Sequence, residues 1–591
     1  MKSWSIGEVA RFLGVKPHVI RYWESELPLL SPPKGLSGRR EYSGNEIRLL
    51  MKFRHLLYDQ KFTIEGAKKR LWEELGAGDP GLTARFAMIR ADLVDALMTV
   101  RGEQGASPPG ETDDMPEREL RERLVAAGQE HLFEHWSARP EPMKRRLLED
   151  LASLDLALVR QLCERLAQRA AAGMPPIRSQ RVGAAAAPAY RGDIVPAPYV
   201  PLAESRIDRE ARELGEEQIR RGRTAFLTVA GGQGTRLGFD GPKGMFPVTP
   251  LRRLTLFALF AEKLLAARRW YGVEIPWLIM TGPHNHEATT NYFEKEEWFG
   301  LGRGSVRLFT QGSVPSLSPE GRLLMAADGG LFVNPNGHGG VIEALRRTGT
   351  LSAMQERGVE HLFHFQVDNP LARVPDPVFL GYHCRGAAQI SSKVVEKAFP
   401  EEKLGVIVIS GGKLSVIEYS DIEESLMRAR GAGGRLVYCQ GSIAMHILDV
   451  AFLANPVLQL PWHLARKKAG TLNPTPEGTE IVERDAVKME MFVFDAIPAA
   501  GRALFFETER AEEFAPLKNR EGEDSIETCE RGQVEQAARW LSACGVEVPR
   551  DAEGRPRHTI EVSPLFALDP AVLAARRGLL KDRIDEDTLL A

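Results

Sequence analysis

The chain has 591 residues, of which 27% are charged and 43% hydrophobic, and its formal net charge is −3. This length predicts several domains and the composition fits a soluble globular protein. The chain has no apolar run of 18 residues, no N-terminal signal-peptide core and no C-x-x-C spacing among its five cysteines. These absences argue against a membrane protein, a disulfide framework and a zinc site, and they predict a cytoplasmic location.

The first 70 residues form a basic head. They contain 14 Lys and Arg against 7 Asp and Glu, so the remaining chain carries a balance near −10. A basic head on an acidic body predicts that the head meets a polyanion.

Two short helices joined by a tight turn are expected in this head. Ser5 and Glu8 form a capping pattern before the first helix, and Pro17 suits the first position of the second helix, PHVIRYWESE. Such a pair is a helix-turn-helix. Its core is expected to contain Ile6, Val9, Ala10, Leu13, Val19, Ile20 and Trp23.

The segment PPKGLSGRREYS predicts a two-stranded wing with Gly38 at its tip, and two further helices follow it. This order, with the motifs I-G-E-V-A, R-Y-W-E, G-R-R-x-Y-S and L-L-Y-x-x-x-F-T-I-E-G-A, resembles the MerR-type winged helix-turn-helix domain over residues 3–72. The resemblance implies contacts with double-stranded DNA from six residues: His18, Arg21, Tyr22, Arg39, Arg40 and Tyr42. A basic protein-interaction module with the same helix spacing is the alternative, and only DNA binding should weaken steeply with salt.

Four segments connect the head to the α/β part of the chain. An apolar stripe from Leu82 to Val100 predicts a helix, and MerR-type proteins typically dimerise through a helix at this position, which implies a homodimer. Residues 102–117 are rich in Gly, Pro and acids and predict a flexible tether. Amphipathic runs from residue 118 predict a small helical cap, and the proline-broken residues 170–203 predict an extended connection over the next domain.

From residue 207 onward, apolar strands such as AFLTVA, PWLIMTG and VRLFTQ alternate with helices. This rhythm predicts βαβ units and an α/β fold with a mostly parallel or mixed, Rossmann-like sheet, whose ligands lie at the carboxyl ends of the strands. The predicted domains are a winged helix-turn-helix head (1–75), a dimer helix and linker (76–116), a helical cap and connection (117–205), a catalytic domain (206–498) and a C-terminal domain (499–591).

The glycine loop, LTVAGGQGTRLGFDGPKGMFP from Leu227 to Pro247, is the strongest functional signal. Backbone amides around its glycines can approach phosphate oxygens closely, and its basic side chains supply charge. The spacing excludes a Walker loop and a dinucleotide fingerprint, because Arg236 and Leu237 stand where those motifs need other residues. A glycine-rich turn with a basic rim is the alternative to a nucleoside triphosphate site. The residues concerned are Gly231, Gly232, Gly234, Arg236 and Lys243.

Further motifs follow the loop in a fixed order. Together with A-G-Q-E-H at 127–131 they resemble the eukaryotic-type UDP-N-acetylglucosamine pyrophosphorylases and related UDP-sugar pyrophosphorylases over about residues 117–567. The motifs are M-T-G-P (280–283), F-T-Q-G-S-V-P-S (309–316), N-P-N-G-H-G-G (334–340), V-D-N-P (367–370), S-K-V-V-E-K (392–397), V-I-E-Y-S (416–420), K-M-E-M-F-V-F-D (488–495), F-A-P-L-K-N (514–519) and E-V-S-P-L (561–565).

The resemblance implies uridylyl transfer, in which a sugar 1-phosphate oxygen attacks the α-phosphorus of UTP in line and pyrophosphate leaves. It implies that Arg236 and the loop amides bind the β- and γ-phosphates, that Lys243 binds the α-phosphate, and that Lys518 contacts phosphate from the opposite side. Asp368 is the expected Mg²⁺ ligand, because a hard cation prefers carboxylate oxygen.

The resemblance also implies binding residues for the base and the sugar. Gln311 and the backbone around Gly337 are expected at the uracil, where a glutamine amide can pair with a donor and an acceptor together, and His338 is expected among the UTP-binding residues. The expected sugar residues are Gly405, Glu418, Ser442, Phe492 and Phe494. The two phenylalanines, being two positions apart, could equally form the inward face of a strand.

Two positions depart from the N-acetylglucosamine enzymes. His338 stands where these enzymes usually have asparagine and resembles UDP-glucose enzymes, although Gly340 fits the N-acetylglucosamine type. Ser442 replaces an asparagine that commonly contacts the N-acetyl group, and serine offers no amide. We therefore expect UDP-N-acetylglucosamine or a related UDP-sugar as product, with UDP-glucose or broad specificity as the alternative.

A second class of function also fits the sequence. The chain could be a MerR-type transcription regulator whose body has become a nucleotide-sugar sensor. The joint presence of the loop glycines, both loop cations, Asp368 and Lys518 favours an enzyme, because a sensor can lose its metal ligand and still bind.

Overall fold

The computed structural model describes residues 4–26, 41–42, 44–59, 117–171, 179–182, 194–205 and 207–591. The chain forms two compact units, Met1–Glu119 and Leu120–Ala591. The first part of the predicted wing with its tip at Gly38, the dimer helix and the tether up to residue 116 lie outside the described residues, as do Arg39 and Arg40.

The head contains the predicted helix-turn-helix. Helix α1 (Ile6–Leu13) and helix α2 (Pro17–Glu26) are separated by Gly14, whose φ of +65° suits glycine. Helix α3 (Gly44–Arg54) follows and continues into the π-helical turn η1 (His55–Asp59). The predicted core is confirmed: Val9, Ala10, Leu13, Ile20 and Trp23 are buried, and Ile6 and Val19 pack against them.

Tyr42 does not lie where the wing resemblance implies. It belongs to strand β2 (Glu41–Tyr42), which pairs antiparallel with strand β1 (Trp4–Ser5), and its side chain is 0% exposed. A buried ring cannot reach DNA, so the prediction for Tyr42 is wrong. The ring instead fills the core of the head beside α1 and α3.

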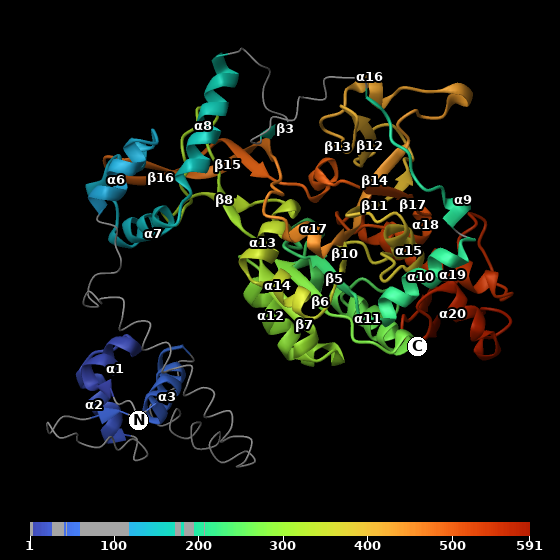
Figure 1. Ribbon diagram of the computed structural model, residues 1–591, viewed down its shortest axis with the longest axis horizontal. Helices are drawn as coiled ribbons and strands as arrows, with labels where there is room; N and C mark the ends of the chain where they lie inside the picture. Colours follow the sequence, from blue (N-terminus) through green and yellow to red (C-terminus); the bar gives the residue numbers. More distant parts are fainter. Residues whose placement is uncertain are drawn as a thin grey trace. The chain divides into compact units, whose positions relative to one another are not determined.

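The body is built around a ten-stranded mixed sheet with the path β13-β12-β14-β10-β5-β6-β7 (Figure 1). Its parallel half consists of β10 (His361–Gln366), β5 (Thr224–Val229), β6 (Trp277–Thr281) and β7 (Val306–Thr310). The other half contains β14 (Gln440–Asp449), β12 (Gly405–Ser410), β13 (Lys413–Ile417), β11 (Ile390–Glu396), β17 (Ala503–Glu507) and β4 (Val195–Pro196). Because β14 runs antiparallel to β10, β11 and β12, the sheet is mixed, as predicted.

Helices cover both faces of this sheet, which gives a three-layered α/β fold. In β5, Phe226 enters one hydrophobic core while Ala225, Leu227 and Val229 enter the other, as expected of a strand buried on both faces. The first core contains residues of α10 (Arg209–Arg220), α11 (Leu256–Tyr271), α12 (His286–Lys295) and α15 (Pro377–Arg385). The second contains residues of α13 (Val341–Arg347), α14 (Thr350–Glu356), α17 (Val450–Ala454) and the 3-10 helix η10 (Val493–Ala499).

The helical cap consists of α6 (Glu117–Val125), α7 (Glu141–Ala152) and α8 (Leu156–Ala171). Gln129 is buried and joins the cap to a loop of the body, because its Nε2 donates to Gly321 O at 3.0 Å and its Oε1 accepts from Leu323 N at 2.8 Å. This loop also contacts the hairpin of β15 (Trp462–Thr475) and β16 (Gly478–Glu490), which is extended by β3 (Ser179–Val182).

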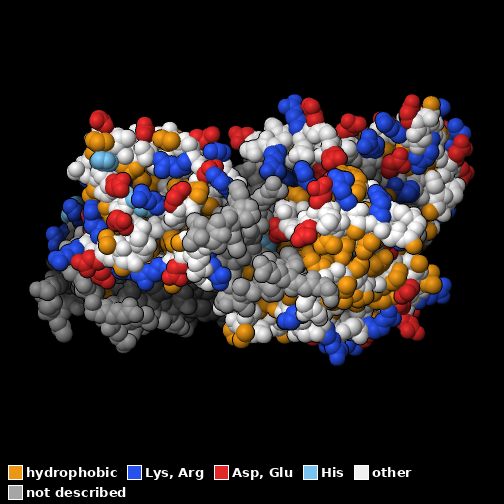
Figure 2. Space-filling model, turned by 90° about the horizontal axis from the view of Figure 1, so that it is seen from above, with side chains coloured by type: hydrophobic (Ala, Val, Ile, Leu, Met, Phe, Trp, Pro, Cys, Tyr) orange, Lys and Arg blue, Asp and Glu red, His pale blue; other side chains and the backbone are white. Residues whose placement is uncertain are grey.

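The C-terminal part follows β17 and contains α18 (Arg510–Glu513), α19 (Ile526–Ala543), α20 (Pro570–Ala575) and the parallel pair β18 (Ile560–Val562) and β19 (Thr588–Leu590). None of the helices in the described part of the chain is long and apolar enough to cross a membrane. Figure 2 shows one face of the molecule, on which basic and acidic side chains are intermingled.

Candidate active site

Four predicted segments follow the four parallel strands directly. The glycine loop follows β5, Gly282 follows β6, Gln311 follows β7 and Asp368 follows β10. Carboxyl ends of neighbouring parallel strands share one edge of the sheet, so these segments lie side by side. This edge is where open α/β sheets bind their ligands.

The glycine loop touches its neighbours so closely that a side chain would not fit. A Cβ atom on Gly231 would lie 2.9 Å from Gln311 Oε1 and 3.3 Å from Gly282 N. Gly232, in contrast, has no atom within 4 Å of such a position. One side of the loop is therefore packed and the other side is open to a ligand.

Asn285 holds this loop against the next one and was not among the predicted residues. Its side chain accepts from Gly282 N at 2.8 Å and donates to Ala230 O at 3.0 Å and Gly232 O at 3.3 Å. It is 1% exposed. Its sequence signal is weak, because an asparagine between two histidines reads as an ordinary turn residue.

The structure brings Lys243 and Asp368 together. Lys243 Nζ lies 3.1 Å from Asp368 Oδ2 and donates to Leu517 O at 3.3 Å, and Leu517 N donates to Asp368 O at 2.8 Å. The two charged side chains are 18% and 19% exposed. A cation and a carboxylate thus lie beside the glycine loop and within reach of a ligand.

Lys518 and Arg236 extend this group of charges. Lys518 follows Leu517 and forms an ion pair with Asp524 at 3.0 Å. Arg236 lies in the 3-10 helix η4 (Thr235–Leu237) and is exposed, and its carbonyl accepts from Arg520 N at 3.1 Å. Arg520 was not among the predicted residues, although it directly follows the motif F-A-P-L-K-N.

Gln311 and Gly337, both expected at the uracil, contact each other. Gln311 Nε2 donates to Gly337 O at 2.6 Å. Gly337 has a φ of +81°, and a Cβ there would lie 2.4 Å from Met491 O, so the N-P-N-G-H-G-G loop lies directly on the segment after β16. The motif expected to bind the uracil and the motif that contains Phe492 and Phe494 therefore pack against each other as one unit.

His338 belongs to the same packed unit, and its own imidazole ring is neutral at neutral pH. It stacks on Phe492 with centroids 5.2 Å apart and an interplanar angle of 25°, and its Nδ1 accepts from Val493 N at 3.2 Å. Burial lowers the pKa of His338 to about 4. At neutral pH this residue supplies packing and a hydrogen-bond acceptor, but no positive charge.

Phe492 and Phe494 are not the inward face of a strand, so that alternative is wrong. Strand β16 ends at Glu490, Phe492 precedes η10, and Phe494 lies within it. Their ring centroids are 5.1 Å apart, and both rings contact His338. The backbone turn after β16 thus directs the rings of Phe492 and Phe494 to the same neighbour, His338.

The predicted sugar residues Gly405, Glu418 and Ser442 also meet. Gly405 of β12 pairs with Ser442 of β14, and a Cβ on Gly405 would lie 3.0 Å from Glu418 Oε2. The pKa of Glu418 is raised to about 7, mainly by burial and then by the charges of Asp421 and Asp495, while Lys518 acts to lower it. Because Lys518 lowers the pKa of Glu418, the residues predicted to bind the sugar lie near a residue predicted to bind phosphate.

The predicted DNA residues lie in the other compact unit. His18, Arg21 and Tyr22 are exposed on α2, and Tyr22 is 50% exposed.

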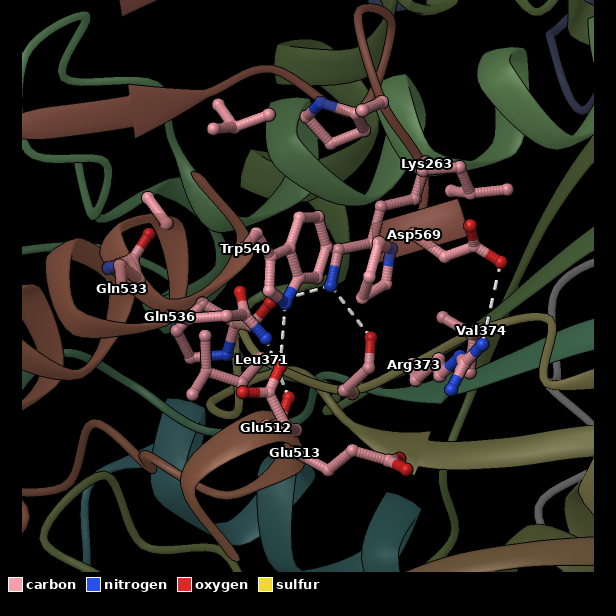
Figure 3. A pocket seen from close by; sticks show the side chains of 18 of the residues that line it. Lys263, Leu371, Arg373, Val374, Glu512, Glu513, Gln533, Gln536, Trp540 and Asp569 are labelled. Atoms are coloured by element: carbon pink, nitrogen blue, oxygen red, sulfur yellow. Dashed lines mark hydrogen bonds and ion pairs between the residues drawn. The ribbon is translucent and has the colours of Figure 1, made fainter. Parts of the chain in front are cut away.

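A separate cavity of about 410 Å³ contains none of the predicted UTP or sugar residues (Figure 3). Several charges in its wall already have partners: Arg373 lies 3.5 Å from Asp569, and Trp540 Nε1 donates to Glu512 at 2.7 Å. Lys263 donates to Pro370 O and Ala372 O at 2.7 Å each, and burial lowers its pKa to about 7. The loop that follows Asp368 forms part of the lining of this cavity, through residues 370–375, but the cavity is not the predicted site.

Comparisons with known proteins agree with these observations. Residues 4–74 match the family model of the MerR HTH family regulatory proteins. UDP-N-acetylglucosamine diphosphorylase 2 of Arabidopsis thaliana is 34% identical over 486 residues, which cover 78% of this chain and 91% of that protein. UDP-N-acetylglucosamine pyrophosphorylase of Saccharomyces cerevisiae is 31% identical over 483 residues, which cover 79% and 98%.

A solved structure shares the fold. The uridine diphosphate N-acetylglucosamine pyrophosphorylase from Trypanosoma brucei, in complex with an inhibitor, aligns with a TM-score of 0.64 at 24% identity, covering 82% of this chain and 99% of that one. The family model described as UTP--glucose-1-phosphate uridylyltransferase matches residues 199–522, which include the glycine loop and Lys518. The resemblance predicted from the motifs is thus confirmed, and the chain belongs to the UTP--glucose-1-phosphate uridylyltransferase family.

Proposed function

We propose that this chain transfers the uridylyl group of UTP to a sugar 1-phosphate and releases pyrophosphate. The observation that carries the proposal is the meeting of the glycine loop, Gln311, Lys243 and Asp368 at one edge of the parallel strands. Family membership supports the same reaction.

The reaction needs two anions in line, with charge moving to the leaving pyrophosphate. The open side of the glycine loop and Arg236 bind the β- and γ-phosphates, and Lys243 binds the α-phosphate. Lys243 pairs with Asp368, so a phosphate bound by Lys243 shares or replaces that contact. Lys518 neutralises phosphate charge from the C-terminal side.

Asp368 is the residue proposed to hold Mg²⁺. Among the described residues no three His, Cys, Asp or Glu side chains form a metal-binding group. A single carboxylate nevertheless fits Mg²⁺, because this ion is commonly held by one or two carboxylates together with substrate phosphates and water. When bound, the ion would offset charge on the transferred and leaving phosphates.

For the sugar we propose N-acetylglucosamine 1-phosphate, and the names of the relatives support this choice. Ser442, one of the residues predicted to bind the sugar, offers a hydroxyl where an amide would distinguish an N-acetylated sugar better from other sugars. We therefore expect relaxed specificity among sugar 1-phosphates. Steady-state rates with UTP and a panel of sugar 1-phosphates test this choice. Faster turnover of glucose 1-phosphate than of its N-acetylamino analogue would favour the UDP-glucose alternative.

We also propose that the head binds double-stranded DNA. The exposed His18, Arg21 and Tyr22 on α2 and the match to MerR HTH regulators support this proposal. The affinity of the full chain for duplex DNA should fall steeply between 50 and 200 mM salt, by roughly 1000-fold if about six phosphates are contacted. Affinity that is independent of salt would favour the protein-interaction module instead. A homodimer and a cytoplasmic location stay predictions.

The sensor alternative gives a different result in the same enzyme assay. A transcription regulator with a sensing body would bind a UDP-sugar but release no pyrophosphate from UTP and any sugar 1-phosphate. Turnover by the wild-type chain would exclude a pure sensor.

A further inference from the structure

His463 is a buried residue that no part of the proposed reaction uses. It is the second residue of strand β15, and its Nε2–H donates to Oδ2 of Asp495 at 2.6 Å. The two side chains are 2% and 1% exposed. A buried, charge-assisted hydrogen bond of this kind fixes the orientation of an imidazole ring.

The ring of His463 supports one wall of the proposed sugar site. Its centroid lies 4.4 Å from that of Phe492, and Phe492 in turn stacks on His338. Three rings therefore follow one another from His463 through Phe492 to the loop that contacts Gln311. A change in the orientation of His463 would shift Phe492.

The other ring nitrogen of His463 faces the opposite wall. Nδ1 lies 4.0 Å from Oδ2 of Asp421 and, among the described residues, has no hydrogen-bond partner. Asp421 lies in the turn that begins at Glu418, because Asp421 N donates to Glu418 O at 2.9 Å. A hydrogen bond from Nδ1 to the Asp421 carboxylate requires a proton on Nδ1 as well as on Nε2, so the ring that bridges the two carboxylates is an imidazolium. A small approach across the 4.0 Å gap would complete that bridge and give the buried nitrogen a partner.

We propose that His463 is a specificity-determining positioning residue that joins the two walls of the sugar site: Asp495 orients it behind Phe492, and its Nδ1 closes onto Asp421 when a sugar is bound. Closure would draw the Glu418 turn toward Phe492 around the sugar hydroxyls. This inference rests on the proposed function. The proximity of Asp421 and Asp495 to Glu418, which raises the pKa of that carboxyl, agrees with a compact site.

The test compares His463→Gln with a matched control, His383→Gln. His383 of α15 is also buried, at 1% exposure, and its Nδ1 shares a hydrogen bond with Ser391 of β11 at 2.8 Å. Helix α15 packs into the first hydrophobic core, whereas Phe492 and Phe494 belong to the second. In His463→Gln the KM for the sugar 1-phosphate should rise by about tenfold, the scale of one charge-assisted hydrogen bond, while the KM for UTP stays within about twofold. In His383→Gln the ratio of the two KM values should not change, whatever happens to Tm.

A double-mutant cycle separates positioning from a general loss of structure. Asp421→Asn and His463→Gln should each weaken UDP-sugar binding, measured by calorimetry, and the double variant should be no weaker than the worse single variant. Asp495→Asn keeps the shape of the site and serves if His463→Gln does not fold. The inference is overturned if His463→Gln changes both KM values equally or if the effects of Asp421→Asn and His463→Gln simply add.

The outcomes also distinguish this inference from the proposed function. Normal turnover with an unchanged sugar KM in His463→Gln removes the inference and leaves the function intact. A wild-type chain that neither turns over nor binds a UDP-sugar removes both.

Discussion

Glu418 is placed so that its charge changes near neutral pH. Its pKa is raised to about 7, mainly by burial and then by Asp421 and Asp495. Because the folded value lies above the ordinary 4.5, the protonated form is favoured on folding, and this contribution to stability is lost as pH rises through 7. The ionised carboxylate, however, accepts stronger hydrogen bonds from sugar hydroxyls.

We therefore predict that the KM for the sugar 1-phosphate falls as pH rises through about 7. In Glu418→Gln this dependence should disappear, while the KM for UTP changes little with pH in either protein. Steady-state kinetics from pH 6 to 8 checks the prediction. A Glu418→Gln variant with the wild-type pH profile would show that another group titrates.

Single residues were predictable from sequence where a motif carried them. The loop glycines, Lys243, Asp368 and Gln311 come together because they directly follow parallel strands, and strand order can be anticipated from a βαβ rhythm. Asn285, Arg520 and His463 could not be found in this way. Their partners are distant in sequence and become visible only when the chain is folded.

At the scale of elements, Asn285 connects the loops that follow β5 and β6. It lies just before α12, and its three hydrogen bonds reach both loops. Asn285→Ala leaves buried backbone groups without partners, so the free energy of unfolding should fall by about 2 kcal/mol. The KM for UTP should rise more than that for the sugar, because the glycine loop loses its support.

Urea unfolding and steady-state kinetics measure both effects, and Asn291→Ala is the control. Asn291 is exposed on α12, so its replacement should alter neither quantity. Equal effects of the two substitutions would contradict a specific role for Asn285.

The elements themselves were predictable to different degrees. Helix α2 has the predicted limits and strand β5 lies within one residue of the predicted run AFLTVA, because a proline start and a short apolar run are local signals. Two strand pairings join segments that are distant in sequence and have no local signal. The pairing of β2 with β1 buries Tyr42, and the antiparallel pairing of β14 with β10 makes the sheet mixed. The turn after β16 likewise broke the two-residue period expected for Phe492 and Phe494.

At the scale of the whole molecule, buried histidines make the body sensitive to acid. Burial lowers the pKa of His338 and His361 to about 4 and that of His364 and His383 to about 3, from an ordinary 6.5. The unfolded chain therefore binds more protons than the folded chain in this range. Stability should be complete above about pH 6.5 and should decrease as pH falls toward 4.

Urea unfolding at pH 7.5, 6.5, 5.5 and 5 tests this prediction. Each unit by which a pKa is lowered is linked to about 1.4 kcal/mol, so the summed loss should reach several kcal/mol. Glu418 and Asp449, whose pKa values are raised, act in the opposite sense but are fewer than the histidines whose pKa values burial lowers. Constant stability down to pH 5 would contradict neutral, buried histidines.

The central claim is uridylyl transfer at the carboxyl ends of β5, β7 and β10. The most direct test is the formation of a UDP-sugar, detected by mass spectrometry with matching pyrophosphate release, from UTP, Mg²⁺ and N-acetylglucosamine or glucose 1-phosphate. We predict turnover by the wild-type chain and a loss of kcat of at least about 100-fold in Lys243→Ala, since one preorganised charge contact on the transition state is removed. No UDP-sugar from the wild-type chain with either sugar, or an undiminished rate in Lys243→Ala, would contradict the account.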